Sequence, residues 1–335
     1  MNLQIAKIEY HLPEKVLTNN DLQQLNPDWD MVKLAEKSGV FQRYIAEPDE
    51  TAFDLACKAV DKLFLGNQEM KDSIDGILFC TQSPDYIMPS NAFLLHKYLN
   101  LKQDVFAFDY TLACSGFIYG LAMAKGFIAT KLAKNILLIN ADTYSRYIHP
   151  KDRSVTILFG DGASVCLLSE TESDGIIDIM LASSGKDFES FIIPSGGCRT
   201  PKSENTSIEK VDESGNIHTD ENIHMNGFGV WKFIASNVPN QIFEILGRNY
   251  YTLNDIDLCI FHQASKLTID SLTKALKINP DRVFNNIANV GNLVSASIPV
   301  AIRDAEIAGK LKRGDLILLS GFGVGLSWGT CIMRY

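Results

Sequence analysis

Cys114 is the residue of this 335-residue sequence best placed to act as a covalent nucleophile. It follows the strand-like run 106–110 and precedes 116–130, which is apolar nearly all round and is therefore expected to be a buried helix. A helix start directs unpaired N–H groups and a partial positive charge at the sulfur, and both favour the thiolate. A cysteine in an arbitrary position is usually a small buried apolar residue. The strand-to-helix turn predicts instead a cysteine that can form a thioester.

Two further polar residues have positions that suit them to assist this cysteine. His262 directly follows the apolar run 258–261, at the carboxyl end of an expected strand, where parallel α/β sheets bind their ligands. Asn292 lies in the polar, glycine-containing turn 289–299, before another expected helix. Taken singly, such a histidine is usually structural and such an asparagine is usually a helix cap. A cysteine nucleophile needs partners, so we take Cys114, His262 and Asn292 as the candidate catalytic residues.

The elements that would position these residues occur twice along the chain. Short, continuous apolar runs are typical of strands buried on both faces, and helical patterns lie between them. Two pairs of segments match, namely 74–80 with 256–262 at an offset of 182 (256 minus 74) and 135–139 with 315–319 at an offset of 180 (315 minus 135). The sequence therefore predicts a layered α/β protein built from two similar halves.

We place these halves at residues 1–170, which carry the cysteine, and 171–335, which carry the histidine and the asparagine. The offset of 180 pairs Val294 with Cys114, so the two helix starts are expected to meet. Residues 199–222 are polar and lack a lasting period, and we expect an exposed loop or hairpin there.

Composition and charge exclude several classes of protein. Forty acidic and 31 basic residues give a formal net charge of −9, which would repel a nucleic acid. The seven cysteines are odd in number and form no CxxC pair, so we expect no metal site, no disulfide framework and a cytoplasmic location. The first residues lack the apolar core of a signal peptide, and we expect no membrane insertion. The glycine runs 159–163 and 321–325 precede strand-like segments, so we also reject nucleotide-binding loops.

Five motifs occur in a characteristic order and spacing. They are Ala113-Cys114-Ser115-Gly116-Phe117, Phe159-Gly160-Asp161-Gly162-Ala163, His262-Gln263-Ala264, Gly291-Asn292 followed by Ser295-Ala296-Ser297-Ile298-Pro299, and Ser327-Trp328-Gly329. Each is weak alone, but together they resemble β-ketoacyl-acyl-carrier-protein synthase III, the priming condensing enzyme of fatty acid synthesis in the thiolase superfamily. The resemblance covers nearly the whole chain. It implies a thiolase-like, five-layered αβαβα fold and a homodimer.

The resemblance also implies a reaction and roles for the candidate residues. Cys114 would take an acyl group from acyl-coenzyme A as a thioester, with no cofactor, because the coenzyme A thioester and phosphopantetheine are substrates. His262 and Asn292 would hold the thioester oxygen of malonyl-acyl carrier protein and stabilise the enolate that forms when carbon dioxide leaves. The backbone N–H groups of Cys114 and Gly325 would form the oxyanion hole of acyl transfer.

Further positions are assigned by the same resemblance. Arg153, Lys37 and Trp29 would bind coenzyme A, although Lys37 stands where the family has arginine and Trp29 is displaced by four residues. Lys232 and Lys274 keep two positions of the family's carrier-protein docking patch, and Lys266 would stand in for a missing arginine.

Three departures from the family pattern leave alternatives open. Ser265, Leu267 and Phe228 replace polar or cationic residues of the family. They modestly favour a divergent relative that serves a specialised pathway, makes an unusual acyl chain or transfers an acyl group to another nucleophile. A noncatalytic partner subunit is the second alternative, but the presence of Cys114, His262 and Asn292 together argues against it.

Overall fold

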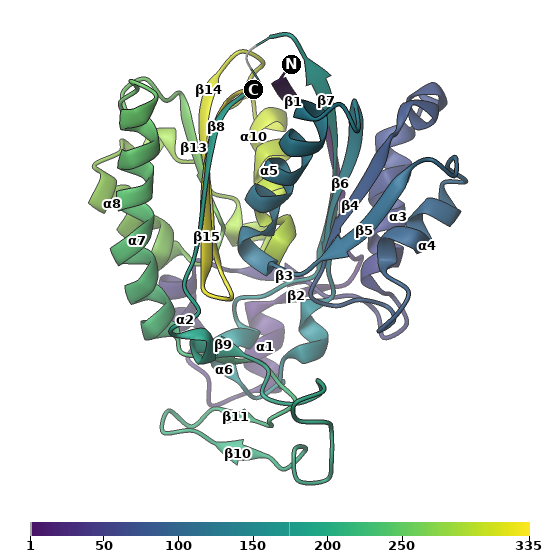
Figure 1. Cartoon of the computed structure of the whole chain (residues 1–335). Helices are drawn as coiled ribbons and strands as arrows, with labels where there is room; N and C mark the ends of the chain where they lie inside the picture. Colours follow the sequence, from purple (N-terminus) through teal and green to yellow (C-terminus); the bar gives the residue numbers. More distant parts are fainter. Residues whose placement is uncertain (1, 174) are drawn as a thin grey trace.

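Two β-sheets stand side by side in the computed structural model, which describes residues 2–173 and 175–335 (Figure 1). The first sheet has the order β1 (Asn2–His11), β7 (Gly162–Thr171), β6 (Asn135–Asp142), β4 (Gly76–Cys80) and β5 (Phe106–Tyr110). The second has the order β8 (Ile176–Ser183), β15 (Ser327–Arg334), β14 (Leu316–Gly323) and β13 (Leu258–Phe261).

Four strands of the first sheet share the topology of the second sheet, and β5 is additional. In the first, β4 pairs parallel with β6, while β6 with β7 and β7 with β1 are antiparallel. In the second, β13 pairs parallel with β14, while β14 with β15 and β15 with β8 are antiparallel. The predicted construction from two similar halves is therefore confirmed. The first sheet ends with β7 and the second begins with β8, and the division of the chain at residue 170 is our proposal for the boundary.

Helices form the other three layers (Figure 1). The central helices α5 (Gly116–Ala129) and α10 (Ser297–Ile307) lie between the sheets. One outer layer consists of α3 (Ala52–Phe64) and α4 (Asn91–Tyr98), and the other of α7 (Gly227–Arg248) and α8 (Lys266–Leu276). The order is αβαβα, so the expected five-layered thiolase-like fold is confirmed.

Strand side chains alternate between two hydrophobic cores. Ile317 and Leu319 of β14 face the central helices, while Leu316 and Leu318 of the same strand face α7 and α8. All four are buried, which explains why these strands are continuous apolar runs. Burying one such side chain contributes roughly 1.5–3 kcal/mol.

Shorter elements join the layers and cover one end of the sheets. They are β2 (Val16–Thr18), α1 (Asn19–Leu25), α2 (Met31–Ser38), β3 (Gln42–Tyr44), α6 (Arg153–Thr156), β9 (Phe191–Ile192), β10 (Lys210–Val211), β11 (Ile217–His218), β12 (His224–Met225) and α9 (Ile287–Val290). The β10–β11 hairpin lies in the polar segment 199–222, as the sequence predicts.

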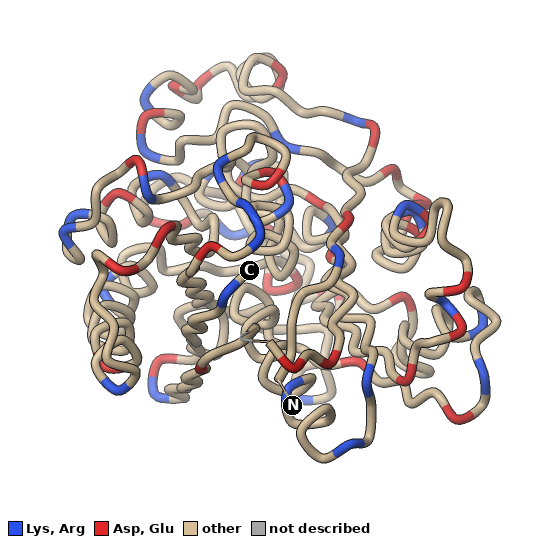
Figure 2. Tube along the Cα trace, turned by 90° about the horizontal axis from the view of Figure 1, so that it is seen from above, with Lys and Arg blue, Asp and Glu red and all other residues tan. Residues whose placement is uncertain are grey.

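Two properties of the whole surface bear on function. Acidic and basic residues are interspersed along the chain in Figure 2 rather than gathered at separate ends, so any basic docking patch must be local. Within residues 2–173 and 175–335, no helix combines the length and apolar character required to cross a bilayer.

Candidate active site

Cys114 lies in η2 (Ala113–Ser115), a 3-10 turn between β5 and α5. Two glycines of the second half make room for this turn. A Cβ on Gly321 would lie 2.9 Å from the Cys114 carbonyl oxygen, and one on Gly323 would lie 2.7 Å from Cys114 Cβ and 3.1 Å from Sγ. The hydroxyl groups of Ser115 and Ser327 share a hydrogen bond of 2.7 Å across the same junction. The glycine run that resembled a nucleotide loop therefore supports the cysteine instead.

The environment of the Cys114 sulfur differs from our sequence-based expectation. The residue is 3% exposed, and burial raises the pKa of its thiol far above the ordinary value. The negative charge of Asp142 raises this pKa further, and a backbone hydrogen bond opposes the rise only in part. Burial therefore favours the protonated thiol, in contrast to the thiolate that the helix start alone predicts. The cysteine must lose its proton as it attacks.

His262 directly follows β13 and is 1% exposed. Its backbone N–H donates to the carbonyl of Ser320 on β14 at 2.8 Å, and its ring meets Phe322 edge-on with centroids 5.7 Å apart. Burial lowers the pKa of the imidazole to about 3, so the ring is neutral at pH 7. Among the described residues, the buried Nδ1 has no hydrogen-bond partner. A neutral imidazole in this position can exchange or donate a proton.

Asn292 is held so that its amide nitrogen is available. Its side-chain oxygen accepts hydrogen bonds from the Val294 N–H at 2.9 Å and the Ser297 hydroxyl at 3.4 Å. Its backbone bonds to Leu158 at 2.8 Å and to Gly160 at 3.0 Å. The motif that begins at Phe159 therefore fixes the asparagine turn. Because the oxygen already caps the turn, the NH₂ group is the part that can serve a ligand.

One cavity of about 350 Å³ brings the three predicted residues together. Cys114, His262 and Asn292 all line it. Most of the remaining lining is apolar, including Phe159, Phe191, Val230, Trp231, Ile234, Leu267 and Phe322. A site lined mostly by apolar side chains strengthens any hydrogen bond to a developing negative charge.

The internal repeat relates Cys114 to a different residue from the one predicted. Ala113 and Val294 both have left-handed backbones, with φ of 43° and 53°, and each begins a 3-10 turn before a central helix. Cys114 therefore corresponds to Ser295, at an offset of 181 (295 minus 114), and its predicted pairing with Val294 is wrong by one residue. The strand register agrees, because Ile136 and Ile317 hold equivalent positions beside β4 and β13.

Of the residues predicted to form the oxyanion hole or to bind coenzyme A, some line the cavity and others do not. Gly323 approaches Cys114, whereas a Cβ on Gly325 would meet Ser327 at 3.2 to 3.4 Å. Lys37 lines the cavity with Ser38. Arg153 adjoins Ser154 of the lining, and its guanidinium donates to the Ser214 carbonyl. Trp29 packs into a small core with Leu22, Met31 and Ile157, and is not among the lining residues.

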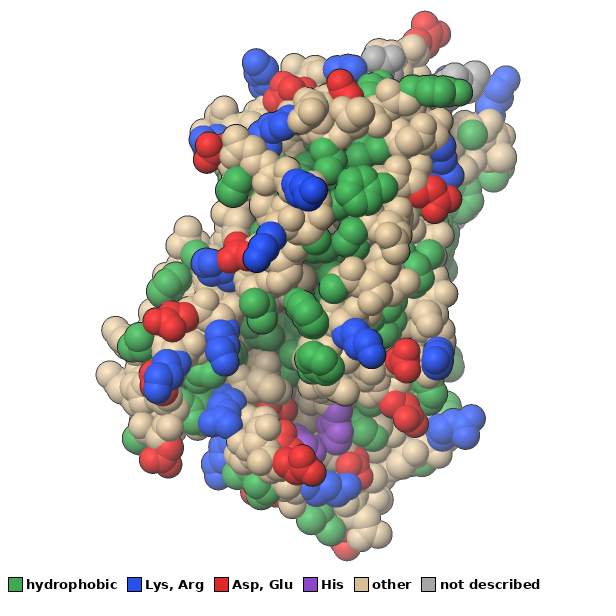
Figure 3. Space-filling model, turned by 90° about the vertical axis from the view of Figure 1, so that its left-hand side faces the viewer, with side chains coloured by type: hydrophobic (Ala, Val, Ile, Leu, Met, Phe, Trp, Pro, Cys, Tyr) green, Lys and Arg blue, Asp and Glu red, His purple; other side chains and the backbone are tan. Residues whose placement is uncertain are grey.

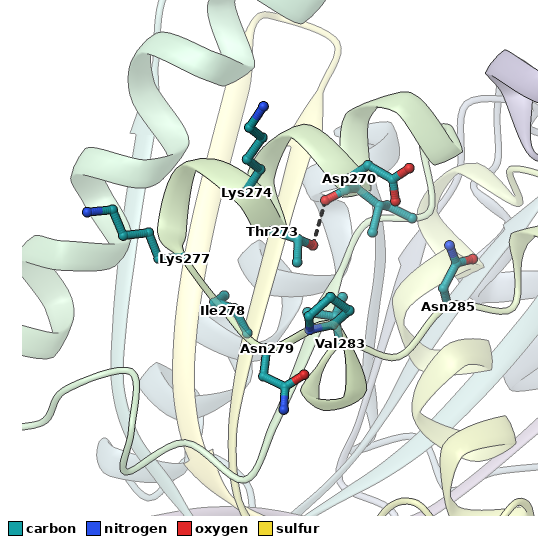
Figure 4. A pocket seen from close by; sticks show the side chains of 10 residues that line it. Asp270, Thr273, Lys274, Lys277, Ile278, Asn279, Val283 and Asn285 are labelled. Atoms are coloured by element: carbon teal, nitrogen blue, oxygen red, sulfur yellow. Dashed lines mark hydrogen bonds between the residues drawn. The ribbon is translucent and has the colours of Figure 1, made fainter.

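The predicted docking lysines lie on two outer helices, and none of them is among the residues that line the cavity. Lys232 is on α7, and Lys266 and Lys274 are on α8. Lys266 forms an ion pair with Asp270, and its Cβ packs against Gly39 at the end of α2. Lys274 lies beside a separate groove of about 700 Å³ on the outside of α8, which Figure 4 shows and which none of the three candidate catalytic residues lines.

Two buried polar residues near the site were missed by the sequence analysis. Asp142 ends β6 and Ser295 belongs to η6 (Val294–Ala296). A signal existed for Asp142, because it comes three residues after the apolar run 136–139, at the end of an expected strand. Within the described residues, no cluster of three or more histidine, cysteine or acidic side chains could hold a metal ion.

The fold and site together define a condensing enzyme of the thiolase type. The protein-family model of 3-oxoacyl-[acyl-carrier-protein] synthase III matches residues 108–185 of this chain. The family model of the C-terminal part of that synthase matches residues 246–335. A β-ketoacyl-[acyl-carrier-protein] synthase III from Caldanaerobacter subterraneus subsp. tengcongensis is 36% identical over 329 residues, which cover 97% of this chain and 95% of the relative.

Solved structures of synthase III enzymes are similar to this chain in both sequence and fold. A 2.1 Å crystal structure of 3-oxoacyl-(acyl-carrier-protein) synthase III is 39% identical with a TM-score of 0.97, covering 100% of both chains. The synthase III from Aquifex aeolicus VF5 is 32% identical with a TM-score of 0.85, covering 99% of this chain and 100% of that one. The chain belongs to the β-ketoacyl-[acyl-carrier-protein] synthase III family and is a condensing acyltransferase of fatty acid biosynthesis. The alternatives of a specialised-pathway relative and a noncatalytic subunit are not favoured.

Proposed function

We propose that the protein transfers an acyl group from acyl-coenzyme A to Cys114 and condenses it with malonyl-acyl carrier protein. In the first step the Cys114 sulfur attacks the thioester carbonyl, and coenzyme A leaves as its thiol with the proton of Cys114. In the second, the malonyl carboxylate loses carbon dioxide, and the resulting enolate attacks the acyl carbonyl and expels the Cys114 thiolate, which takes up one proton from water to restore the thiol. The meeting of Cys114, His262 and Asn292 in one buried cavity is the observation that carries this proposal.

The two half-reactions use different donors. Neutral His262 and the free NH₂ group of Asn292 would donate to the malonyl thioester oxygen as the enolate forms. Acyl transfer would use the N–H of Cys114 and one from the loop 323–325, which includes the predicted Gly325. No cofactor or metal takes part in this scheme, because coenzyme A and phosphopantetheine enter as substrates.

Coenzyme A would enter past the end of α2 and the start of α6. Lys37 lines the cavity there, and Arg153 stands next to Ser154, so both cations can reach phosphate groups at the entrance. Trp29 packs in a small core with Ile157, and Ile157 lines the cavity. Trp29 would therefore support this part of the cavity wall. We retain all three residues as the proposed coenzyme A site.

Carrier-protein docking is the proposal that charge can test. The α7–α8 face in Figure 3 shows apolar side chains along its middle with lysine and arginine among them. Reversing Lys232 and Lys274 to glutamate is expected to raise the Michaelis constant for malonyl-acyl carrier protein about tenfold at low salt, since carrier proteins are acidic. Self-acylation by a small acyl-coenzyme A should change little.

Steady-state kinetics at two salt concentrations measure this effect, with Lys312→Glu and Lys131→Glu as a charge-matched control. Lys266 is the third member of the patch, but its charge is partly neutralised by Asp270, so we expect a smaller effect from its reversal. Carrier-dependent turnover that ignores the double reversal would favour an extender attached to coenzyme A.

We also propose a homodimer formed through β5. This strand is the edge of the first sheet, so one row of its backbone groups has no strand partner among the residues that the structure describes. The adjacent loop exposes Tyr86 by 58%, Ile87 by 100% and Met88 by 80%. Two copies that paired their β5 edges would continue the sheet and cover these apolar groups.

The double substitution Ile87→Glu and Met88→Glu is therefore expected to convert the dimer to a monomer in analytical ultracentrifugation. Leu65→Glu is the control, because Leu65 is 80% exposed but lies outside this surface. A wild-type protein that sediments as a monomer at micromolar concentration would disprove the proposal.

A cytoplasmic location completes the proposed function. All seven cysteines are free, and six of them are buried. Free thiols persist in a reducing compartment. Cell fractionation that recovers the protein outside the cytoplasm would contradict this assignment.

A further inference from the structure

A buried carboxyl group joins the two halves beside the active site. Asp142 ends β6 and is fully buried. One of its oxygens accepts a hydrogen bond from the Gln82 N–H at 2.7 Å, and the other accepts one from the Ser295 hydroxyl at 2.6 Å. Gln82 follows β4, whereas Ser295 lies in η6 before α10. One carboxyl group thus connects two strand ends of the first half to a turn of the second.

The turn that Asp142 holds also orients Asn292. Val294, the neighbour of Ser295 in η6, donates its N–H to the Asn292 side-chain oxygen. The internal repeat explains the arrangement, because Ser295 corresponds to Cys114 and Asp142 corresponds to Gly323 at the same offset of 181 (323 minus 142). Gly323 leaves the space that the Cys114 side chain fills. At the equivalent position of the first sheet, the Asp142 carboxyl accepts a hydrogen bond from Ser295 and holds it in place.

On the basis of the proposed function, we propose that Asp142 is a positioning residue for malonyl decarboxylation: through Ser295 it holds the turn that presents Asn292 to the cavity. Neither Asp142 nor Ser295 is among the residues that line the cavity. They act on the substrate only through Asn292, which does line it. Self-acylation of Cys114 does not require the Asn292 amide and should depend less on this connection.

The charge of Asp142 gives the proposal a second observable. Burial raises the pKa of its carboxyl to about 7, although hydrogen bonds from Ser295 and Gln82 oppose the rise. The carboxyl is therefore neutral below about pH 7 and negative above it. Once negative, it raises the pKa of the Cys114 thiol and opposes thiolate formation.

Burial shifts the pKa values of the other titratable groups around Asp142 and Cys114 as well. Burial raises the pKa of Cys80 to about 12 and those of Tyr144 and Tyr147 above their ordinary values, while it lowers that of His262 to about 3. Burial also raises the pKa of the Asp161 carboxyl above its ordinary value, although hydrogen bonds from Ser145 and Ala46 oppose the rise.

Ser295→Ala tests the positioning role. The substitution removes the hydroxyl that Asp142 holds, and we expect malonyl decarboxylation to fall on the order of tenfold to a hundredfold, as for a small misplacement of a catalytic group. Self-acylation of Cys114 should stay within about threefold of wild type. Ser164→Ala is the matched control, because Ser164 is also fully buried on the first sheet but its hydroxyl has no hydrogen-bond partner among the described residues.

Asp142→Asn separates geometry from charge. Asparagine can still accept from the Gln82 N–H and can donate to the Ser295 oxygen, so decarboxylation should remain within about threefold of wild type. Alkylation of Cys114 by iodoacetamide, followed by peptide mass spectrometry, should be several-fold faster than in wild type at about pH 8. At about pH 6 the two rates should be equal, since the wild-type carboxyl is then protonated. Asp109→Asn, which changes a half-buried carboxyl of β5 that accepts a hydrogen bond from the Asn91 N–H, should alter neither rate.

These measurements can overturn the proposal independently of the proposed function. If Ser295→Ala decarboxylates malonyl thioesters at the wild-type rate, or if it loses self-acylation by the same factor, Asp142 does not position Asn292. A ratio of alkylation rates that is constant between about pH 6 and pH 8 would show that the Asp142 charge does not act on Cys114. A wild-type protein without any decarboxylation would instead refute the proposed function, while the alkylation comparison would still be informative.

Discussion

Cys114→Ala is expected to lose acyl-enzyme formation completely and condensation by on the order of four powers of ten. The thiol supplies the covalent intermediate, and alanine leaves no nucleophile in the cavity that Cys114 lines. Condensation is measured as the release of carbon dioxide and of the 3-oxoacyl product in the presence of both substrates.

Cys166→Ala is the matched control for this variant. Cys166 is fully buried on β7 but packs in the central core, away from the cavity lining. We expect this variant to keep nearly wild-type turnover and to lose some thermal stability, because a small cavity replaces the sulfur. If Cys114→Ala retains substantial condensation while Cys166→Ala does not, the nucleophile has been assigned to the wrong cysteine.

His262→Ala and Asn292→Ala are expected each to reduce malonyl decarboxylation about a hundredfold to a thousandfold while leaving measurable self-acylation. Each substitution removes one neutral donor from the enolate, whereas the backbone N–H groups that would serve acyl transfer remain. The two half-reactions are measured separately, by carbon dioxide release and by the mass of the acyl-enzyme.

Asn289→Ala is the control for the asparagine variant, because Asn289 lies in α9, three residues before Asn292, and is exposed. Decarboxylation at the wild-type rate in both the His262 and Asn292 variants would mean that the enolate is stabilised elsewhere. Loss of self-acylation to the same extent as decarboxylation would show that the substitutions disrupt the cavity as a whole.

The architecture and the three candidate catalytic residues could be predicted because local sequence signals coincide with their positions. Continuous apolar runs mark the strands, and His262 directly follows one of them. The small-residue segments around Cys114 and Asn292 mark the starts of the two central helices. Repetition of the same pattern indicated that the two helix starts would meet.

Other features depend on packing between distant segments and were not predictable. A helix start favours a thiolate when it is considered alone, but burial and the charge of Asp142 reverse the balance at Cys114. Cys114 pairs with Ser295 because Ala113 and Val294 both have left-handed backbones. Alanine and valine rarely adopt this conformation, so the residue types did not indicate it. The bond from Ser295 to Asp142 spans 153 residues of sequence.

The packing of Trp29 was another such feature. A tryptophan near the start of α2 could face either the cavity entrance or the core beneath it, and the sequence does not distinguish these. In the structure it packs with Leu22 and Met31, while Lys37 at the other end of α2 reaches the cavity.

Mass spectrometry of the acyl-enzyme tests the central claim most directly. The wild-type protein is incubated with acyl-coenzyme A, its intact mass is recorded, and the modified peptide is sequenced before and after malonyl-acyl carrier protein is added. We predict one acyl group per chain, attached to Cys114 and discharged when the malonyl carrier is supplied. An acyl group on another residue, or no acyl group under conditions in which condensation proceeds, would contradict the account.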